Sequence, residues 1–156
     1  MSKAVLANIM LPETSEEIDE DEARIGYLLR QANTAHRMKV EMILEKQKIT
    51  LPQFSILTFC GMYPGLSNAD LARLTGLTPQ TVSVIVANLE RKELIARHAH
   101  EIHGRIQHIE LTDAGQNVLD KCNKPVIAFQ NKLTADLSPK EEKVIRRWLI
   151  SVAKDD

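Results

Sequence analysis

Aromatic residues are scarce in this sequence, with one tryptophan, two tyrosines and three phenylalanines among 156 residues. Since apolar residues still make up 44% of the chain, a core has to be built mainly from leucine, isoleucine, valine and alanine. Long apolar runs are also absent, because no stretch approaches the roughly 18 residues that a membrane-spanning helix needs. The apolar segment 4–11 is too short for a span and lacks the basic flank of a signal peptide. We interpret it as an arm that packs on a partner chain.

Cysteine is rare as well, and the two residues present are poorly placed for a disulfide scaffold. Cys60 and Cys122 lie far apart without paired spacing, which favours a reduced, cytoplasmic protein. Cys60 lies in the uncharged stretch 51–66, where burial raises a thiol's pKa and makes it inert. Core cysteines are the favoured interpretation, and a redox switch is the alternative.

Motifs of catalysis are missing too. The sequence contains no glycine-rich phosphate loop, no H-E-x-x-H and no readable Ser/His/Asp arrangement. We therefore expect no enzyme activity, no catalytic residues and no cofactor.

Net charge is close to zero, at −1, but it is unevenly distributed. Residues 1–22 contain one lysine and seven acidic residues, so an arm of −6 precedes a body of +5. We expect residues 1–20 to form an N-terminal arm that is acidic from residue 13. A solvated tail beside a solvated helix is the common reason for such a division, so it does not by itself indicate a nucleic-acid partner.

Helical periodicity is clearest near the N-terminus. Apolar residues recur every three or four positions from about 21 to 48, which predicts one amphipathic helix of about seven turns. A helix this long needs a large surface for its apolar stripe, and in a small chain that surface is often a second copy. The uncharged stretch that follows predicts a buried helix over 53–62, with Pro52 suited to its first turn.

Two short helices joined by a tight turn are predicted in the centre of the chain. Ser67 and Asp70 form an S-x-x-D capping box, and Gly76 can adopt the left-handed conformation that ends a helix. Thr78 then caps the second helix, which has proline at its first position. A hairpin follows, because β-compatible stretches flank a short turn near 102–104. Helix, turn, helix and hairpin in this order indicate a winged helix-turn-helix.

The C-terminal part is predicted to be helical. Thr112 is expected to cap a long helix that continues to about residue 136. Pro125 should bend or break this helix, because proline deletes a hydrogen bond and crowds the preceding turn. A second capping box, which starts at Ser138, begins the last helix.

The stretch "LPQFSIL…LSNADLARLTGLTPQTVSVIVANLERKELIARH…GRIQHIELTDAG" resembles the MarR (multiple-antibiotic-resistance regulator) family of bacterial transcription factors. The resemblance covers 51–115 closely, and the long helices extend it over 20–153. It implies a mainly α fold with a small β-hairpin wing, in which 51–112 bind DNA and the helices of 21–50 and 113–156 form the dimerisation region. It further implies a homodimeric repressor of double-stranded DNA on a pseudo-palindromic operator, released by a small anionic or aromatic effector.

Carried over position by position, the resemblance places the DNA contacts on the second short helix, in the major groove, and on the wing, in the minor groove. Family members often have a basic residue where this chain has Val84. Their wing tip has an acidic residue and two arginines where this chain has His103, Gly104 and Arg105. Arg105 is therefore the minor-groove candidate, without the carboxylate that normally steadies it. The predicted DNA-contacting residues are Ser67, Thr78, Pro79, Gln80, Thr81, Ser83, Val84, Ala87, Asn88, Arg91, Arg97, His98 and Arg105.

Residues 51–112, here called the reading head, carry no net charge, since they contain five basic and five acidic side chains. Phosphate neutralisation supplies most non-specific affinity, so we expect weak non-specific binding and greater reliance on base edges. Val84 and Ala87 would then meet thymine methyl groups, while Gln80 or Asn88 would pair with adenine. The alternatives are that Val84 and Ala87 are tolerated surface residues, or that the winged helix is a protein-interaction module.

Four histidines, at positions 98, 100, 103 and 108, crowd the predicted wing, and His108 is expected opposite His98 on the return strand. With an ordinary pKa of about 6.5, they suit phosphate contacts that strengthen on protonation. Exposed histidines without a role are the main alternative. A metal site is disfavoured, because the turn holds only one carboxylate and no thiol.

The resemblance also implies a ligand pocket between the dimerisation helices and the DNA-binding lobe. By position, the candidates are Tyr27, Arg30, His36, Met62 and Tyr63, with Arg30 able to pair with a carboxylate. The alternative is that these side chains pack in the dimer seam or face water.

Overall fold

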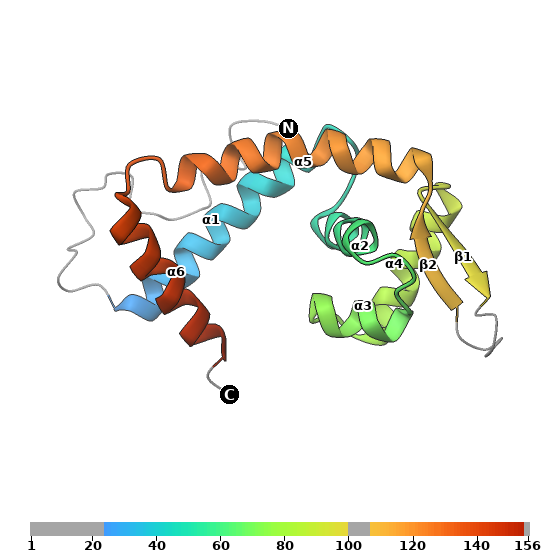
Figure 1. The fold of residues 1–156 in the computed structure, drawn as a ribbon, viewed down its shortest axis with the longest axis horizontal. Coiled ribbons are helices and arrows are strands. Elements are labelled where there is room, and N and C mark those ends of the chain that lie inside the picture. The colour runs from blue at the N-terminus through green and yellow to red at the C-terminus, as the bar shows by residue number, and fades with distance from the viewer. Residues whose placement is uncertain (1–23, 100–106, 155–156) are drawn as a thin grey trace.

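The computed structural model describes residues 24–99 and 107–154, which form six α-helices and one two-stranded antiparallel sheet. The elements are α1 (Ile25–Glu45), α2 (Leu51–Met62), α3 (Asn68–Thr75), α4 (Pro79–Arg91), β1 (Ile95–Ala99), β2 (Gln107–Leu111), α5 (Asp113–Leu133) and α6 (Pro139–Lys154). Figure 1 shows α2, α3, α4 and the hairpin gathered in one lobe, α1 and α6 in an arm on the other side of the view, and α5 running along both. The prediction of a mainly helical chain with a small hairpin is confirmed.

Local hydrogen bonds determine where the helices begin. The Thr50 hydroxyl accepts from the Gln53 N–H at 3.4 Å, and the Gln53 side chain accepts from the Thr50 N–H at 3.1 Å. This capping box starts α2 at Leu51, two residues before the predicted start. Thr112 caps α5 as predicted, by accepting from the Gly115 N–H at 3.0 Å.

Helix α5 continues through Pro125, so of the two predicted outcomes, a bend or a break, the break is wrong. Cys122 and Val126 on either side of it are 1% and 4% exposed, so the helix is anchored in the core both before and after the proline. Pro125 itself lies on the exposed face, where water can reach the carbonyl that lacks its helical donor.

Helix α1 ends at Glu45, three residues before the predicted end at 48. Lys48 adopts the left-handed conformation, with φ of +54°, and its N–H donates to the Glu45 carbonyl at 2.9 Å. The chain reverses at this point, and Ile49 enters the core at 5% exposure. The end of α1 is therefore set by a tight turn that delivers an apolar side chain to the lobe.

The core lies where α2 meets the other elements of the lobe, since α2 contacts α1, α3, α4, α5 and β2. Its central side chains are almost fully buried: Ile56, Leu57, Cys60, Leu71, Val82, Val86, Leu89 and Ile109 are at most 1% exposed. The N-terminus of α5 approaches this core so closely that a Cβ added at Gly115 would lie 1.9 Å from the carbonyl oxygen of Leu94. Glycine at 115 is thus required by packing between two backbones.

The wing is a hairpin with one additional partner. In the β1–β2 register His98 lies opposite His108, as predicted. The segment after α2 also pairs with β2, because the Gly65 N–H donates to the Ile109 carbonyl at 3.3 Å and the Ile109 N–H donates to the Leu66 carbonyl at 2.9 Å. This third segment, which the sequence analysis did not identify, anchors the wing to α2. The turn between the strands, with His100, His103 and Arg105, lies outside the described residues.

The arm formed by α1 and α6 leaves much apolar surface uncovered. No residue of α6 is buried, even though the helix carries a stripe of apolar side chains. Five of these side chains are between 38% and 48% exposed, namely Val144, Ile145, Trp148, Leu149 and Val152. The predicted capping box of α6 is present, with the Ser138 N–H donating to Glu141 Oε2 at 2.8 Å. Across the described ranges, none of the helices has the length and apolar character needed to cross a membrane.

Candidate nucleic-acid interface

Helix α4 is held against α3 by one buried face. Val82, Val86 and Leu89 on α4 and Leu71 on α3 are each 0% exposed. The turn between the two helices is formed at Gly76, whose φ of +67° is the predicted left-handed conformation. Burial of one face leaves the opposite face and the first turn of α4 on the surface of the lobe.

The first turn of α4, residues 78–81, is exposed. The Thr78 hydroxyl accepts from the Thr81 N–H at 3.2 Å, and the two threonine hydroxyls lie 2.8 Å apart. Pro79 occupies the first helical position and Gln80 the next. Because a helix N-terminus carries partial positive charge and free N–H groups, this turn suits contact with an anionic backbone.

The outward face of α4 is mixed rather than uniformly exposed. Val84 is 62% exposed, the largest exposed apolar group on this helix, and Ser83 and Arg91 are also exposed. Ala87 and Asn88 are only half-buried, so they lie at the border between the groove-facing surface and the core. The prediction of a valine on the water-facing side is confirmed.

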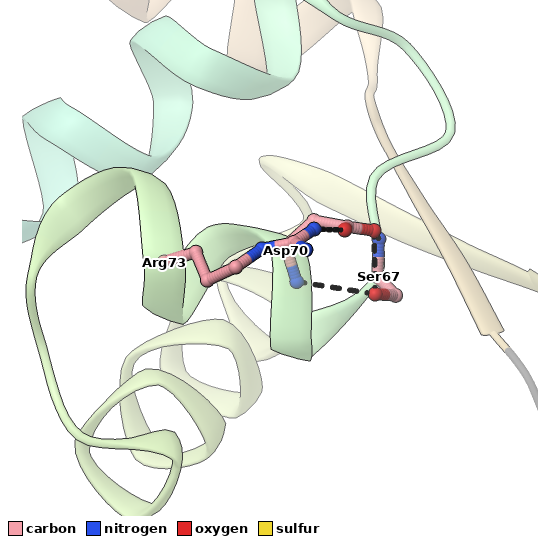
Figure 2. A network of polar contacts seen from close by, with 3 residues as sticks. All are labelled: Ser67, Asp70 and Arg73. Atoms are coloured by element: carbon pink, nitrogen blue, oxygen red, sulfur yellow. Dashed lines mark hydrogen bonds and ion pairs between the residues drawn. The ribbon is translucent and has the colours of Figure 1, made fainter.

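Ser67 is engaged in the capping box of α3 (Figure 2). Its N–H and its hydroxyl both donate to Asp70 Oδ2, at 3.0 and 2.6 Å, and its oxygen accepts from the Asp70 N–H at 3.2 Å. The hydroxyl bond and then the backbone bond from Ser67 hold the pKa of Asp70 below its usual range. Arg73 also pairs with Asp70. Both donors of Ser67 are thus used within the helix cap, which leaves its predicted DNA contact with little support.

Ion pairs compensate part of the positive charge of the reading head. Arg97 Nε on β1 lies 3.0 Å from Glu90 Oε2 on α4, and the Arg97 side chain is only 24% exposed. Lys92 donates to the Lys48 carbonyl at 3.4 Å. Arg91 forms no ion pair within the part of the chain that the structure describes. Among the predicted cationic DNA contacts, Arg91 is therefore better placed than Arg97.

The wing histidines form a cross-strand pair with a carboxylate nearby. His98 is exposed, and its Nε2 lies 3.9 Å from Glu110 Oε2, beyond normal hydrogen-bond distance. Histidine, cysteine and acidic side chains do not gather in threes at metal-binding distance anywhere in residues 24–99 and 107–154.

The predicted ligand residues lie in three places. The Arg30 guanidinium lies over the Tyr27 ring at 5.6 Å on α1, and His36 stacks on Phe129 of α5 at 5.7 Å. Met62 and Tyr63 at the end of α2 are 60% and 50% exposed. The role of these five residues in ligand binding remains a prediction.

A separate cleft of about 740 Å³ opens between the C-terminal half of α1 and the start of α2. Its lining combines apolar side chains with charged ones, and none of the five predicted ligand residues contributes to it. The lining residues are Arg37, Met38, Glu41, Met42, Glu45, Lys48, Ile49, Thr50, Leu51 and Pro52.

Both cysteines are buried in the core, and burial raises the pKa of each thiol. It raises the pKa of Cys60 to about 11. Each thiol is about 1% exposed, which agrees with core packing. A thiol with a raised pKa forms little of the reactive thiolate near neutral pH.

Two helices joined by a tight turn, an exposed first turn on the second helix and a β-hairpin directly after it define a winged helix-turn-helix protein. Comparison with known proteins gives the same class. Residues 47–106 match the family model described as MarR family. The HTH-type transcriptional repressor Rv2887 of Mycobacterium tuberculosis is 31% identical over 135 residues, which cover 86% of this chain and 97% of the repressor. The chain belongs to the MarR family and is a DNA-binding transcriptional regulator.

Two solved structures share the fold over most of this chain. Staphylococcus aureus MepR in complex with DNA has a TM-score of 0.77 and 26% identity, covering 83% of this chain and 94% of that chain. Rv2887 in complex with p-aminosalicylic acid has a TM-score of 0.66 and 29% identity, covering 85% of this chain and all of that chain.

Proposed function

We propose that this protein is a homodimeric repressor in the bacterial cytoplasm that binds a pseudo-palindromic operator and releases it when a small aromatic acid binds. The observation that carries DNA recognition is the exposed first turn of α4, held outwards because Val82, Val86 and Leu89 are fully buried behind it. Helix-turn-helix proteins place such a turn against base edges in the major groove. MepR, which shares this fold, has been crystallised with DNA and supports the proposal.

Base recognition is assigned mainly to two exposed side chains of α4. Gln80 lies in the first turn and can pair bidentately with adenine. Val84 is 62% exposed and can contact a thymine methyl group. Thr78, Pro79, Thr81, Ser83 and Arg91 surround them and add further DNA contacts, while Ala87 and Asn88 lie at the border of the contact. On the wing, His98 and Arg105 are the proposed minor-groove contacts.

The homodimer is proposed because α6 has no buried residue in the single chain. Its apolar side chains, with Trp148 38% and Ile150 55% exposed, make a patch that a second copy would cover. The helices of 21–50 and 113–156 would then form the dimerisation region and set the spacing of the two reading heads. Sedimentation should give a dimer for the wild type and a monomer for Trp148→Glu, and a monomeric wild type at micromolar concentration would contradict the proposal.

The effector is proposed from Rv2887, whose structure contains p-aminosalicylic acid. Arg30 is the proposed partner of its carboxylate, with Tyr27 beside it as an aromatic surface. Arg37, in the cleft, is already paired with Glu41 at 2.9 Å, so an anion there would compete with a carboxylate of the protein itself. His36, Met62 and Tyr63 would complete the ligand site between the arm and the lobe.

Footprinting on the DNA upstream of the protein's own gene tests the repressor proposal. We expect protection of one discrete region, with two half-sites about one helical turn apart and an affinity that falls with salt. Protection of no discrete region at protein concentrations that coat non-specific DNA would contradict it. That result would favour a protein-interaction module on the same fold.

A further inference from the structure

A hydrogen bond joins the first residue of α3 to the groove-facing side of α4. Asn68 Nδ2 donates to Ser83 Oγ at 3.4 Å, although the two residues are 15 positions apart in the sequence. Asn68 is half-buried, while Ser83 is exposed among the proposed DNA contacts. The bond therefore connects a half-buried side chain to an exposed one on the surface proposed to contact DNA.

The backbone on both sides of this bond is fixed. Asn68 lies inside the capping box of Ser67 and Asp70, whose three hydrogen bonds set the first turn of α3 (Figure 2). Leu71 and Val82, each 0% exposed, then lock α3 onto α4. Asn68 can hold Ser83 at little backbone entropic cost, because the backbone of both residues is already ordered in the two helices.

The burial of the Asn68 amide determines which way it faces. Its Oδ1 is buried and has no hydrogen-bond partner in the described part of the chain. If the amide were reversed, the buried atom would be an NH₂ group with two unsatisfied donors. Buried unpaired donors are rarer than under-satisfied acceptors, so the amide keeps its NH₂ toward Ser83. The Ser83 oxygen is consequently an acceptor in this bond.

The proton of Ser83 is not used by its own helix. Several hydroxyls elsewhere in the helices donate to the carbonyl four residues earlier: Thr34 to Arg30, Ser55 to Leu51, Thr58 to Phe54, and Thr75 to Leu71. Ser83 makes no such bond to Pro79 among the described residues. Because Asn68 occupies one side of the Ser83 oxygen, the O–H can point toward the groove.

We propose that Asn68 is a positioning residue for DNA recognition, which holds Ser83 so that its hydroxyl donates to an acceptor oxygen or nitrogen of the operator. Donation from Asn68 also polarises the Ser83 hydroxyl and makes it a better donor. Asn68 itself touches no DNA. This inference rests on the proposed contact between the exposed face of α4 and DNA.

A double-mutant cycle on operator affinity tests the inference, with wild type, Asn68→Ala, Ser83→Ala and the double variant compared at one salt concentration. A neutral hydrogen bond is worth about a factor of two to ten, so Ser83→Ala should weaken operator binding by about that factor for each half-site. Asn68→Ala should weaken it by a similar or smaller factor. The double variant should bind no more weakly than Ser83→Ala alone. Thermal unfolding midpoints show whether each variant is folded.

Asn68→Asp is the matched control for the direction of the bond. An aspartate at this position accepts the Ser83 proton and takes the donor away from DNA, so it should lose at least as much affinity as Ser83→Ala. Losses of Asn68→Ala and Ser83→Ala that multiply in the double variant would overturn the inference, as would an Asn68→Asp variant that binds like wild type. If wild type itself protects no discrete DNA site, the proposed function fails instead.

Operators changed at single base pairs identify the acceptor. A Ser83→Ala loss that is the same on every operator indicates a phosphate oxygen, whereas a loss that disappears for one changed base pair indicates a base. Both results support the positioning role, provided that Asn68→Ala loses affinity on the same operators as Ser83→Ala. A different pattern of losses for Asn68→Ala would contradict it.

Discussion

Arg97 Nε lies 3.0 Å from Glu90 Oε2, so the first strand of the wing is tied to the C-terminal turn of the recognition helix, α4, by an ion pair. The pair ties the wing to α4, and it also compensates the positive charge of Arg97, one of the predicted DNA-contacting residues. The low non-specific affinity expected of a neutral reading head therefore has a specific structural source.

Removal of the Glu90 carboxylate should strengthen non-specific DNA binding. In Glu90→Gln the positive charge of Arg97 is no longer compensated by this neighbour. The slope of log affinity against log salt should steepen by up to about one for each protomer. Asp120→Asn on α5, whose carboxylate accepts from Gln116 at 2.8 Å, makes the same change in net charge and is the control. If Glu90→Gln and Asp120→Asn steepen the salt dependence equally, only the overall charge of the protein matters and the ion pair has no special role.

The close approach of Gly115 to Leu94 predicts a strong effect on stability. Gly115→Ala places a methyl group 1.9 Å from the Leu94 carbonyl oxygen, so α5 or the wing must move. Overpacking of this kind destabilises by about 1–3 kcal/mol or more, measurable as a lower free energy of unfolding in urea. Gly26→Ala on α1 is the matched control, because an added Cβ there meets nothing within 4 Å. It should be neutral or stabilise by up to about 1 kcal/mol.

The capping box of α3 should make stability depend on pH in the acidic range. Bonds from Ser67 lower the pKa of Asp70 in the folded state, so Asp70 contributes stability above its unfolded pKa of about 3.9. That contribution is lost as pH falls from about 4 through the folded pKa. Asp70→Asn should lower the free energy of unfolding by about 0.3–1 kcal/mol at pH 7 and progressively less below pH 4.

Ser67→Ala should show a smaller pH dependence of the same sign, because it removes the hydroxyl donor that lowers the pKa of Asp70 most and keeps the backbone N–H donor. Urea unfolding at several pH values between 7 and 2.5 provides the measurement. A difference between wild type and Asp70→Asn that stays constant down to pH 2.5 would contradict the account.

Response to an aromatic acid should depend on Arg30 rather than on the cleft. We expect p-aminosalicylic acid to lower the operator affinity of wild type and of Arg37→Ala, and to have little effect on Arg30→Ala. Arg30 has Tyr27 beside it, while Arg37 already pairs with Glu41. A response that is lost in Arg37→Ala and kept in Arg30→Ala would place the effector in the cleft. No response in wild type would remove this acid from the candidates.

Features set by neighbouring residues could be predicted from the sequence. The capping boxes at Ser67 and Ser138 and the left-handed turn at Gly76 need only partners within three or four positions. The opposition of His98 and His108 follows from the centre of the hairpin turn. The box at Thr50 has the same T-x-x-Q spacing and could have been identified by the same rule.

Features that depend on packing between distant segments could not be predicted. The bridge between Leu66 and Ile109 joins segments more than 40 residues apart, and the Gly115–Leu94 contact joins a helix to a loop. Local backbone geometry at Pro125 predicts a bend or a break, whereas the burial of the helix on both sides keeps α5 continuous. In each of these cases tertiary contacts outweigh the local signal.

The central claim is that the exposed face of α4 reads base edges, with Gln80 and Val84 as its main contacts. The most direct test measures the affinities of wild type, Gln80→Ala and Val84→Ala for the operator and for a set of operators changed at single base pairs. Each variant should lose discrimination at one base pair in each half-site, by about 1–3 kcal/mol for Gln80, while its salt dependence stays that of wild type. Replacement of thymine by uracil at the base pair that Val84 contacts should weaken binding of wild type but not of Val84→Ala. If both variants keep the affinity and the base preference of wild type, α4 does not read the operator through this face and the account is wrong.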